Sequence, residues 1–157
     1  MSATKSSGGG GGSVTPSSVF EASEFPVRIS VMTYNVWGAH HWPARAPSLR
    51  QVFQSSHTDV VLLQEVTPDI IRCLDETLIT HERVKDKRRP GWQTESQIYW
   101  NKTLFSLVDF GFGELGIPDN PNRGLFWVRL SVKSNPKITF FASTVHFPWC
   151  GCETEVG

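Results

Sequence analysis

Apolar and polar residues alternate over residues 27–36, a period of two that is typical of a β-strand. A second apolar run covers residues 59–65 and is continuous through its middle, as in a strand buried on both faces. A helix-sized segment with apolar residues on one face, residues 48–57, lies between the two runs. The pattern therefore predicts a strand, a helical crossover and a second strand parallel to the first.

The same reasoning predicts a second helix and then a series of strands. Thr67 is a suitable N-cap and Pro68 suits the first position of a helix, which we expect to end near residue 79. Polar residues dominate the stretch 80–93, which predicts a loop. Further strands are expected over residues 96–101, 104–110, 124–132 and 138–147. Together these elements predict an α/β (α+β) fold built on a mixed sheet, with helices on one face.

Length and composition fit one folded domain preceded by a tail. The chain has 157 residues, of which 39% are hydrophobic and 11% aromatic, enough for a sizeable core. Residues 1–25 are rich in Ser and Gly, and we expect them to form a flexible tail. Residues 26–157 then hold the domain.

Composition also narrows the setting in which the protein works. We expect neither a transmembrane helix nor a signal peptide, because the sequence has no long apolar run and no apolar segment near its start. Cys73, Cys150 and Cys152 are an odd number of cysteines, which favours a reducing compartment such as the cytoplasm or nucleus. The formal net charge of zero argues against nucleic-acid binding by overall charge but leaves room for a local basic groove.

Candidate chemistry lies where the first two strands end. Asn35 falls at the end of the first strand and Glu65 at the end of the second. Parallel strands bring their carboxyl ends to one sheet edge, where α/β sheets bind ligands. An amide oxygen and a carboxylate there suit Mg²⁺, with Mn²⁺ as a substitute. The alternatives are a turn-forming Asn35 and an exposed Glu65.

Five short strings resemble the endonuclease/exonuclease/phosphatase superfamily, which has the deoxyribonuclease-I-like fold. They occur in family order and cover residues 27–149, although each string alone has little specificity. They are Thr33-Tyr34-Asn35-Val36-Trp37, Leu63-Gln64-Glu65-Val66, Gln97-Ile98-Tyr99-Trp100, Arg123-Gly124-Leu125-Phe126 and Ser143-Thr144-Val145-His146-Phe147.

The resemblance implies a four-layer αββα sandwich and a magnesium-dependent phosphoester hydrolase of the phosphodiesterase or nuclease type. Its substrate would be a phosphoester, with nucleic acid among the candidates. By the same resemblance, Asn35 organises the metal or its waters and Glu65 is the metal carboxylate. His146 corresponds to the histidine that lies beside the scissile phosphate. For His146 the alternative is a hydrogen-bonded core imidazole.

Two further residues are weaker candidates. The resemblance suggests that Glu95 hydrogen-bonds His146 across the sheet, although the register is off by one residue. Arg123 either contacts phosphate or is a surface arginine in a loop.

The stretch from 81 to 92 carries five basic and two acidic residues, a net charge of +3. It is either a solvated loop or a segment that steers an anionic substrate, with Trp92 available for stacking. His40 and His41 are expected to be loop histidines, because adjacent side chains rarely converge on one metal ion.

The sequence also departs from the family. The family's later strings, Gly-Asp-x-Asn and Ser-Asp-His, do not occur. We therefore expect roughly the first half of the domain. The alternative to an enzyme is an inactive fragment or isoform that acts as an interaction module. A half-domain would leave core residues uncovered, and the expected ones are Phe140, Phe126, Leu130 and Ile98.

Overall fold

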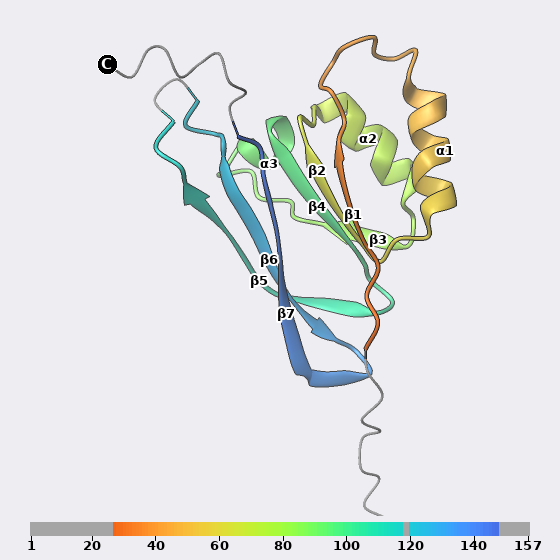
Figure 1. Ribbon diagram of the computed structural model, residues 1–157, viewed down its shortest axis with the longest axis vertical. Coiled ribbons are helices and arrows are strands. Elements are labelled where there is room, and N and C mark those ends of the chain that lie inside the picture. The colour runs from red at the N-terminus through yellow and green to blue at the C-terminus, as the bar shows by residue number, and fades with distance from the viewer. Residues whose placement is uncertain (1–26, 118–119, 148–157) are drawn as a thin grey trace, which may run out of the picture.

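The computed structural model describes residues 27–117 and 120–147 (Figure 1). The predicted tail over residues 1–25 and the cysteines Cys150 and Cys152 lie outside the described residues. The elements, in chain order, are β1 (Val31–Asn35), α1 (Ala46–Ser56), β2 (Val60–Gln64), α2 (Pro68–Thr77), β3 (His81–Arg83), α3 (Gly91–Thr94), β4 (Ser96–Asn101), β5 (Phe105–Glu114), β6 (Gly124–Val132) and β7 (Asn135–Val145).

The first half of the chain forms a four-stranded mixed sheet with the order β1-β2-β4-β3. As predicted, β1 and β2 are parallel, and their register pairs Val31 with Val60 and Asn35 with Gln64. Helices α1 and α2 pack on one face of this sheet (Figure 1). The core there joins Phe53 of α1 and Leu74 of α2 to alternate residues of β2.

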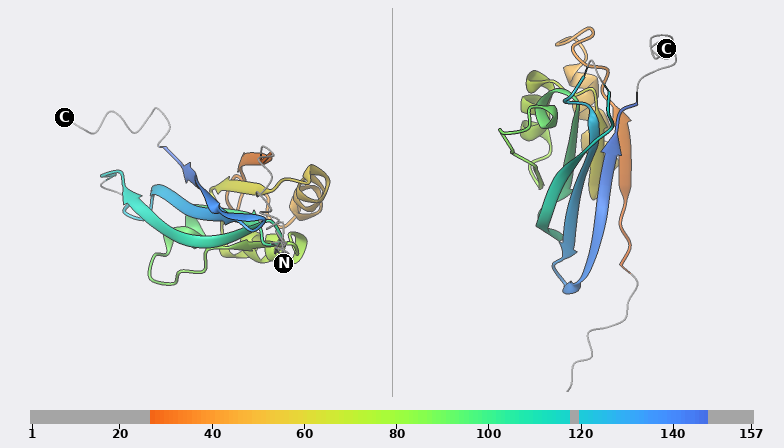
Figure 2. Two further views of the ribbon diagram at one scale, coloured as in Figure 1. Left: turned by 90° about the horizontal axis from the view of Figure 1, so that it is seen from below. Right: turned by 90° about the vertical axis from the view of Figure 1, so that its left-hand side faces the viewer.

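The second half forms a three-stranded antiparallel sheet, β5-β6-β7, which packs on the other face of the first sheet (Figure 2). The expectation of uncovered core residues is wrong for Ile98, Phe126 and Leu130, each of which is 0% exposed between the two sheets. Phe140 is half-buried and packs against Phe105. The error has a physical reason: the described residues already contain both sheets, and each covers the inner face of the other.

Local signals explain most helix boundaries. Thr67 caps α2 as predicted, because its hydroxyl oxygen accepts a hydrogen bond from the Ile70 amide at 3.4 Å. α1 begins earlier than predicted, at Ala46, with a proline in its first turn and no side-chain cap. The predicted loop over 80–93 contains the short elements β3 and α3. No helix in the described part of the chain is long and apolar enough to span a membrane.

A half-buried histidine makes stability depend on pH. His81 of β3 lies with Nε2 2.8 Å from the Thr58 carbonyl oxygen, and burial lowers its pKa below the ordinary 6.5. The folded state therefore binds this proton less readily than the unfolded state does. The resulting stability is present above about pH 6.5 and is lost as pH falls toward the folded pKa.

We expect the free energy of unfolding to fall between pH 7 and pH 5, and His81→Gln to reduce this fall. Urea unfolding at both pH values measures it. His57→Asn is the matched control, because His57 is exposed and has a left-handed backbone that Asn tolerates. Identical pH dependence in the wild type and His81→Gln would contradict the assignment.

Candidate active site

The two predicted strand-end residues meet. Asn35 is the last residue of β1, and Glu65 directly follows β2. The Asn35 amide nitrogen donates to Oε1 of Glu65 at 2.7 Å, while its amide oxygen accepts from the Trp37 backbone N–H at 2.8 Å. Asn35 thus orients the carboxylate and also fixes the start of the next loop.

The Glu65 backbone is strained at this point. Its φ is 57°, a left-handed conformation that costs a non-glycine residue on the order of 1–3 kcal/mol. Two backbone hydrogen bonds hold it there: Glu65 N–H donates to the Glu95 carbonyl at 2.7 Å, and Gly38 N–H donates to the Glu65 carbonyl at 3.0 Å. Strain of this kind gathers at functional sites, where the surrounding structure imposes one side-chain direction.

His146 comes to the same place from the second sheet. It directly follows β7, and its Nε2 lies 3.3 Å from Oε1 of Glu65. Its Nδ1 is buried and has no hydrogen-bond partner among the described residues. The structure therefore brings Asn35, Glu65 and His146 together, as the sequence predicted.

A glutamine that the sequence pattern did not mark as a site residue joins the two sheets beside this trio. The Gln64 side chain donates to the hydroxyl oxygens of Thr144 in β7, at 2.7 Å, and Thr33 in β1, at 3.1 Å. The sequence signal for a role of Gln64 was its position directly before Glu65 in the string Leu63-Gln64-Glu65-Val66. Its partner in β7, which lies 80 positions along the chain, could not be read from local pattern.

Glu65 and His146 border an open cavity of about 390 Å³. The cavity is lined by Gly38, Glu65, Val66, Thr67, Thr94, Glu95, Arg123 and His146. It therefore contains both weaker candidates, Glu95 and Arg123, beside the main ones.

Glu95 does not make the expected bond to His146. One carboxylate oxygen accepts from the Asn120 side chain at 2.8 Å, and the other lies 3.1 Å from Nε of Arg123. Both partners come from the segment before β6, a position that strand register alone did not reveal. Among the described residues only Nε of the Arg123 guanidinium is bonded, so its other N–H groups can reach an anion in the cavity.

Glu65 could serve as a protein ligand of a magnesium ion. Within residues 27–117 and 120–147, no three His, Cys, Asp or Glu side chains converge as a metal cluster. Oε1 of Glu65 faces Asn35 and His146, whereas Oε2 has no hydrogen bond in the described part of the chain. Mg²⁺ keeps several waters and often takes only one or two protein carboxylates together with substrate oxygens. Glu65 matches that chemistry.

Trp92, the last residue of the basic stretch, is not available for stacking. It is 1% exposed and packs edge-on against Phe126, with ring centroids 4.8 Å apart. Its apolar surface is better buried between the sheets than left in a loop. The proposal of stacking by Trp92 was therefore wrong.

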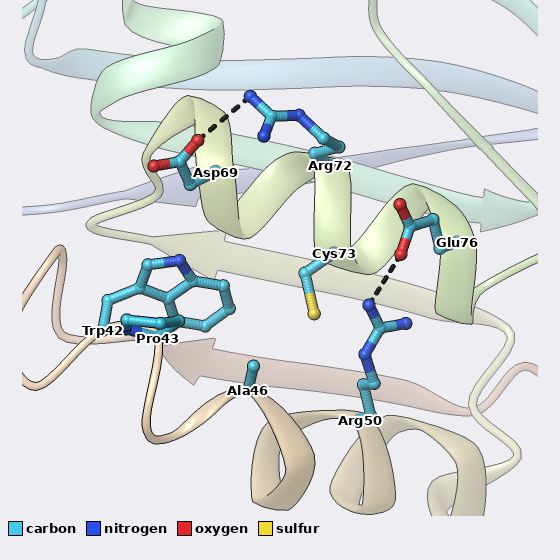
Figure 3. A pocket seen from close by; sticks show the side chains of 8 residues that line it. All are labelled: Trp42, Pro43, Ala46, Arg50, Asp69, Arg72, Cys73 and Glu76. Atoms are coloured by element: carbon cyan, nitrogen blue, oxygen red, sulfur yellow. Dashed lines mark hydrogen bonds and ion pairs between the residues drawn. The ribbon is translucent and has the colours of Figure 1, made fainter.

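A larger hollow of about 530 Å³ lies between α1 and α2 (Figure 3). Its charged groups satisfy one another: Arg50 pairs with Glu76 at 2.6 Å, and Arg72 pairs with Asp69 at 3.0 Å. Burial raises the pKa of the Cys73 thiol, which keeps it in its unreactive form. Because its charged groups are already paired, this hollow is a poorer candidate for binding a phosphoester than the cavity at the strand ends.

Comparison with known proteins assigns the class. Residues 32–148 match the model of the Endonuclease/Exonuclease/phosphatase family. The chain belongs to this family. Comparison with curated protein sequences finds no significant match.

Solved structures confirm the fold. D. rerio TDP2 complexed with a single-strand DNA product matches with TM-score 0.64 at 18% identity, covering 81% of this chain and 49% of that one. ANGEL2, a 2',3'-cyclic phosphatase in complex with adenosine-2',3'-vanadate, matches with TM-score 0.63 at 21% identity, covering 78% and 42%. A mannosyl-6-phosphatase of Bacteroides thetaiotaomicron matches with TM-score 0.65 at 21% identity, covering 80% and 54%. The chain spans about half the length of these structures.

Proposed function

We propose that the described residues form the metal-binding side of a magnesium-dependent phosphoester hydrolase of the phosphodiesterase or nuclease type. The observation that carries the proposal is the meeting of Asn35, Glu65 and His146 at one edge of two packed sheets. Arg123 lines the same cavity and adds a cation suited to phosphate. The family is typically metal-dependent, which agrees with this donor set.

Each residue has a separate role in this proposal. Glu65 would hold the ion through its carboxylate, which Asn35 orients by donating to Oε1. Bound magnesium would polarise a phosphoryl oxygen and lower the pKa of a coordinated water. His146 presents Nε2 beside Glu65, where it can donate a hydrogen bond to an oxygen of the substrate. Arg123 would bind a non-bridging phosphate oxygen.

The substrate class rests on what the similar structures share. One is complexed with a single-strand DNA product, one is a 2',3'-cyclic phosphatase, and one is a mannosyl-6-phosphatase. Phosphoester chemistry is common to these names, whereas the group attached to the phosphate differs. We therefore extend only the reaction class to this chain.

A second candidate function is an interaction module without catalysis. The outer face of β6 and β7 exposes Phe141 by 66% and Leu125 by 38%, and apolar surface of this kind favours association.

Calorimetric titration of the chain with MgCl₂ tests the metal site directly. We expect saturable binding of one ion per chain, because the cavity holds one unbonded carboxylate oxygen. A panel of single-stranded DNA, cyclic nucleotide and sugar phosphate, assayed with magnesium and with EDTA, tests the reaction. Hydrolysis that persists in EDTA would contradict the role of magnesium. No magnesium binding and no hydrolysis would contradict the enzyme proposal and favour the interaction module.

A further inference from the structure

Three aromatic rings gather in the loop between β1 and α1. Trp37 lies with its ring centroid 4.3 Å from that of His40 and 5.7 Å from that of His41, and the two histidine rings are 4.7 Å apart. Trp37 is 53% exposed, so this cluster is a surface feature and not part of the core. We call these three residues the Trp37 platform.

The platform is held in place by one arginine. The Arg45 guanidinium donates to the carbonyl oxygens of Val36 at 2.9 Å, Gly38 at 2.9 Å and His40 at 2.6 Å. It also lies 5.6 Å from the centre of the Trp37 ring, within the range of a cation–π contact. The loop is therefore ordered before any ligand arrives, which reduces the entropy lost on binding.

Two residues of the platform have a strained backbone. Trp37 has φ 61° and His41 has φ 51°, both left-handed and both unfavourable for bulky residues. Trp37 remains exposed, so burial of its side chain does little to offset the cost of this backbone conformation. Strain of this sort points to a binding role.

The platform adjoins the proposed active site. The Trp37 N–H donates to Asn35, the residue that orients Glu65. Its neighbour Gly38 donates to the Glu65 backbone and lines the cavity. A group attached to a phosphate in that cavity therefore lies within reach of the loop that carries the rings.

We propose that the Trp37 platform stacks against a nucleobase next to the phosphoester, so that the substrate is a nucleic acid. The inference rests on the proposed function, because it names the substrate class of the same site. Every base has a π-face, and stacking on an aromatic side chain contributes about 1–3 kcal/mol per base. A sugar phosphate has no such face, and a lipid tail gains little from two polar imidazoles.

The test compares two probes on the 157-residue chain. One is a short fluorescein-labelled oligothymidylate. The other is an oligomer of equal length and charge in which every base is replaced by hydrogen. Fluorescence anisotropy with magnesium, and again with EDTA, gives both dissociation constants.

We expect the wild type to bind the oligothymidylate about 5- to 150-fold more tightly than the abasic probe, the range that corresponds to one stacked base. Trp37→Ala should remove this preference and leave abasic binding unchanged, whereas Trp37→Phe should retain part of it. Ile79→Ala is the control, because Ile79 is an exposed apolar residue outside the lining of the cavity.

Three results would overturn the platform: equal affinity of the wild type for both probes, no binding of the oligothymidylate, or an equal loss for both probes in Trp37→Ala. Failure of the proposed function would give a different combination of results from failure of the platform. Base preference without magnesium binding would remove the metal site and leave the platform. Magnesium binding with equal probe affinities would do the reverse.

Discussion

Glu65→Gln is expected to abolish magnesium binding and to lower any magnesium-dependent hydrolysis by about a hundredfold or more. The change keeps the shape of the side chain but removes its negative charge. The Gln carbonyl oxygen can still accept from Asn35, so the local fold should survive. A metal ion contributes several kcal/mol to charge stabilisation in phosphoryl transfer, and about 1.4 kcal/mol corresponds to tenfold in rate.

Calorimetry with MgCl₂ and the phosphoester panel measure this effect, and thermal unfolding checks that the variant is folded. Glu82→Gln is the control, because Glu82 is an exposed glutamate on β3 with the same chemistry and no part in the cavity. Unchanged magnesium affinity in Glu65→Gln would show that the ion, if bound, is held elsewhere.

Gly124→Ala is expected to cost about 3 kcal/mol or more of folding stability, at the upper end of what overpacking usually costs. Gly124 opens β6 next to Arg123, and a Cβ atom there would collide with the Gly113 carbonyl oxygen and the Phe112 ring. The carbonyl belongs to the neighbouring strand β5, so relief requires the two strands to separate. A flexible side chain could move aside at low cost, but a paired backbone cannot.

The same pair of strands provides the control. A Cβ atom at Gly113 would lie 3.6 Å from Cβ of Leu125, an ordinary contact. Gly113→Ala should therefore change the free energy of unfolding by less than about 1 kcal/mol, within the range of tolerated changes. Chemical denaturation of both variants decides the matter. Similar stabilities for the two would show that β5 and β6 are not packed as described.

The sequence predicted the parts of the site that depend on strand order. Asn35 and Glu65 follow from the hydrophobic pattern, because parallel strands end at the same edge. His146 came from the family resemblance, and the structure places its Nε2 3.3 Å from Glu65. Their catalytic roles remain proposals.

The remaining contacts depend on loops and on packing between sheets, which local pattern does not encode. Glu95 bonds to Asn120 and Arg123, which lie outside any strand or helix and far from it along the chain. No sequence pattern around Arg45 predicts its role, yet its guanidinium holds the loop through hydrogen bonds to backbone carbonyls. Trp92 stands in a polar stretch, but tertiary packing places it in the core.

The bond from Gln64 to Thr144 ties the geometry of the proposed site to the spacing between the two sheets. The carboxylate and the imidazole belong to different layers, and this bond is a direct polar link between them beside the cavity. The 3.3 Å separation of the two groups is therefore a property of interlayer spacing. Enlarging or trimming residues such as Ile98 or Val128, which pack between the sheets, is expected to shift one layer against the other and change this separation. The geometry of the proposed site is thus set by the packing of the interior as well as by the residues of the cavity.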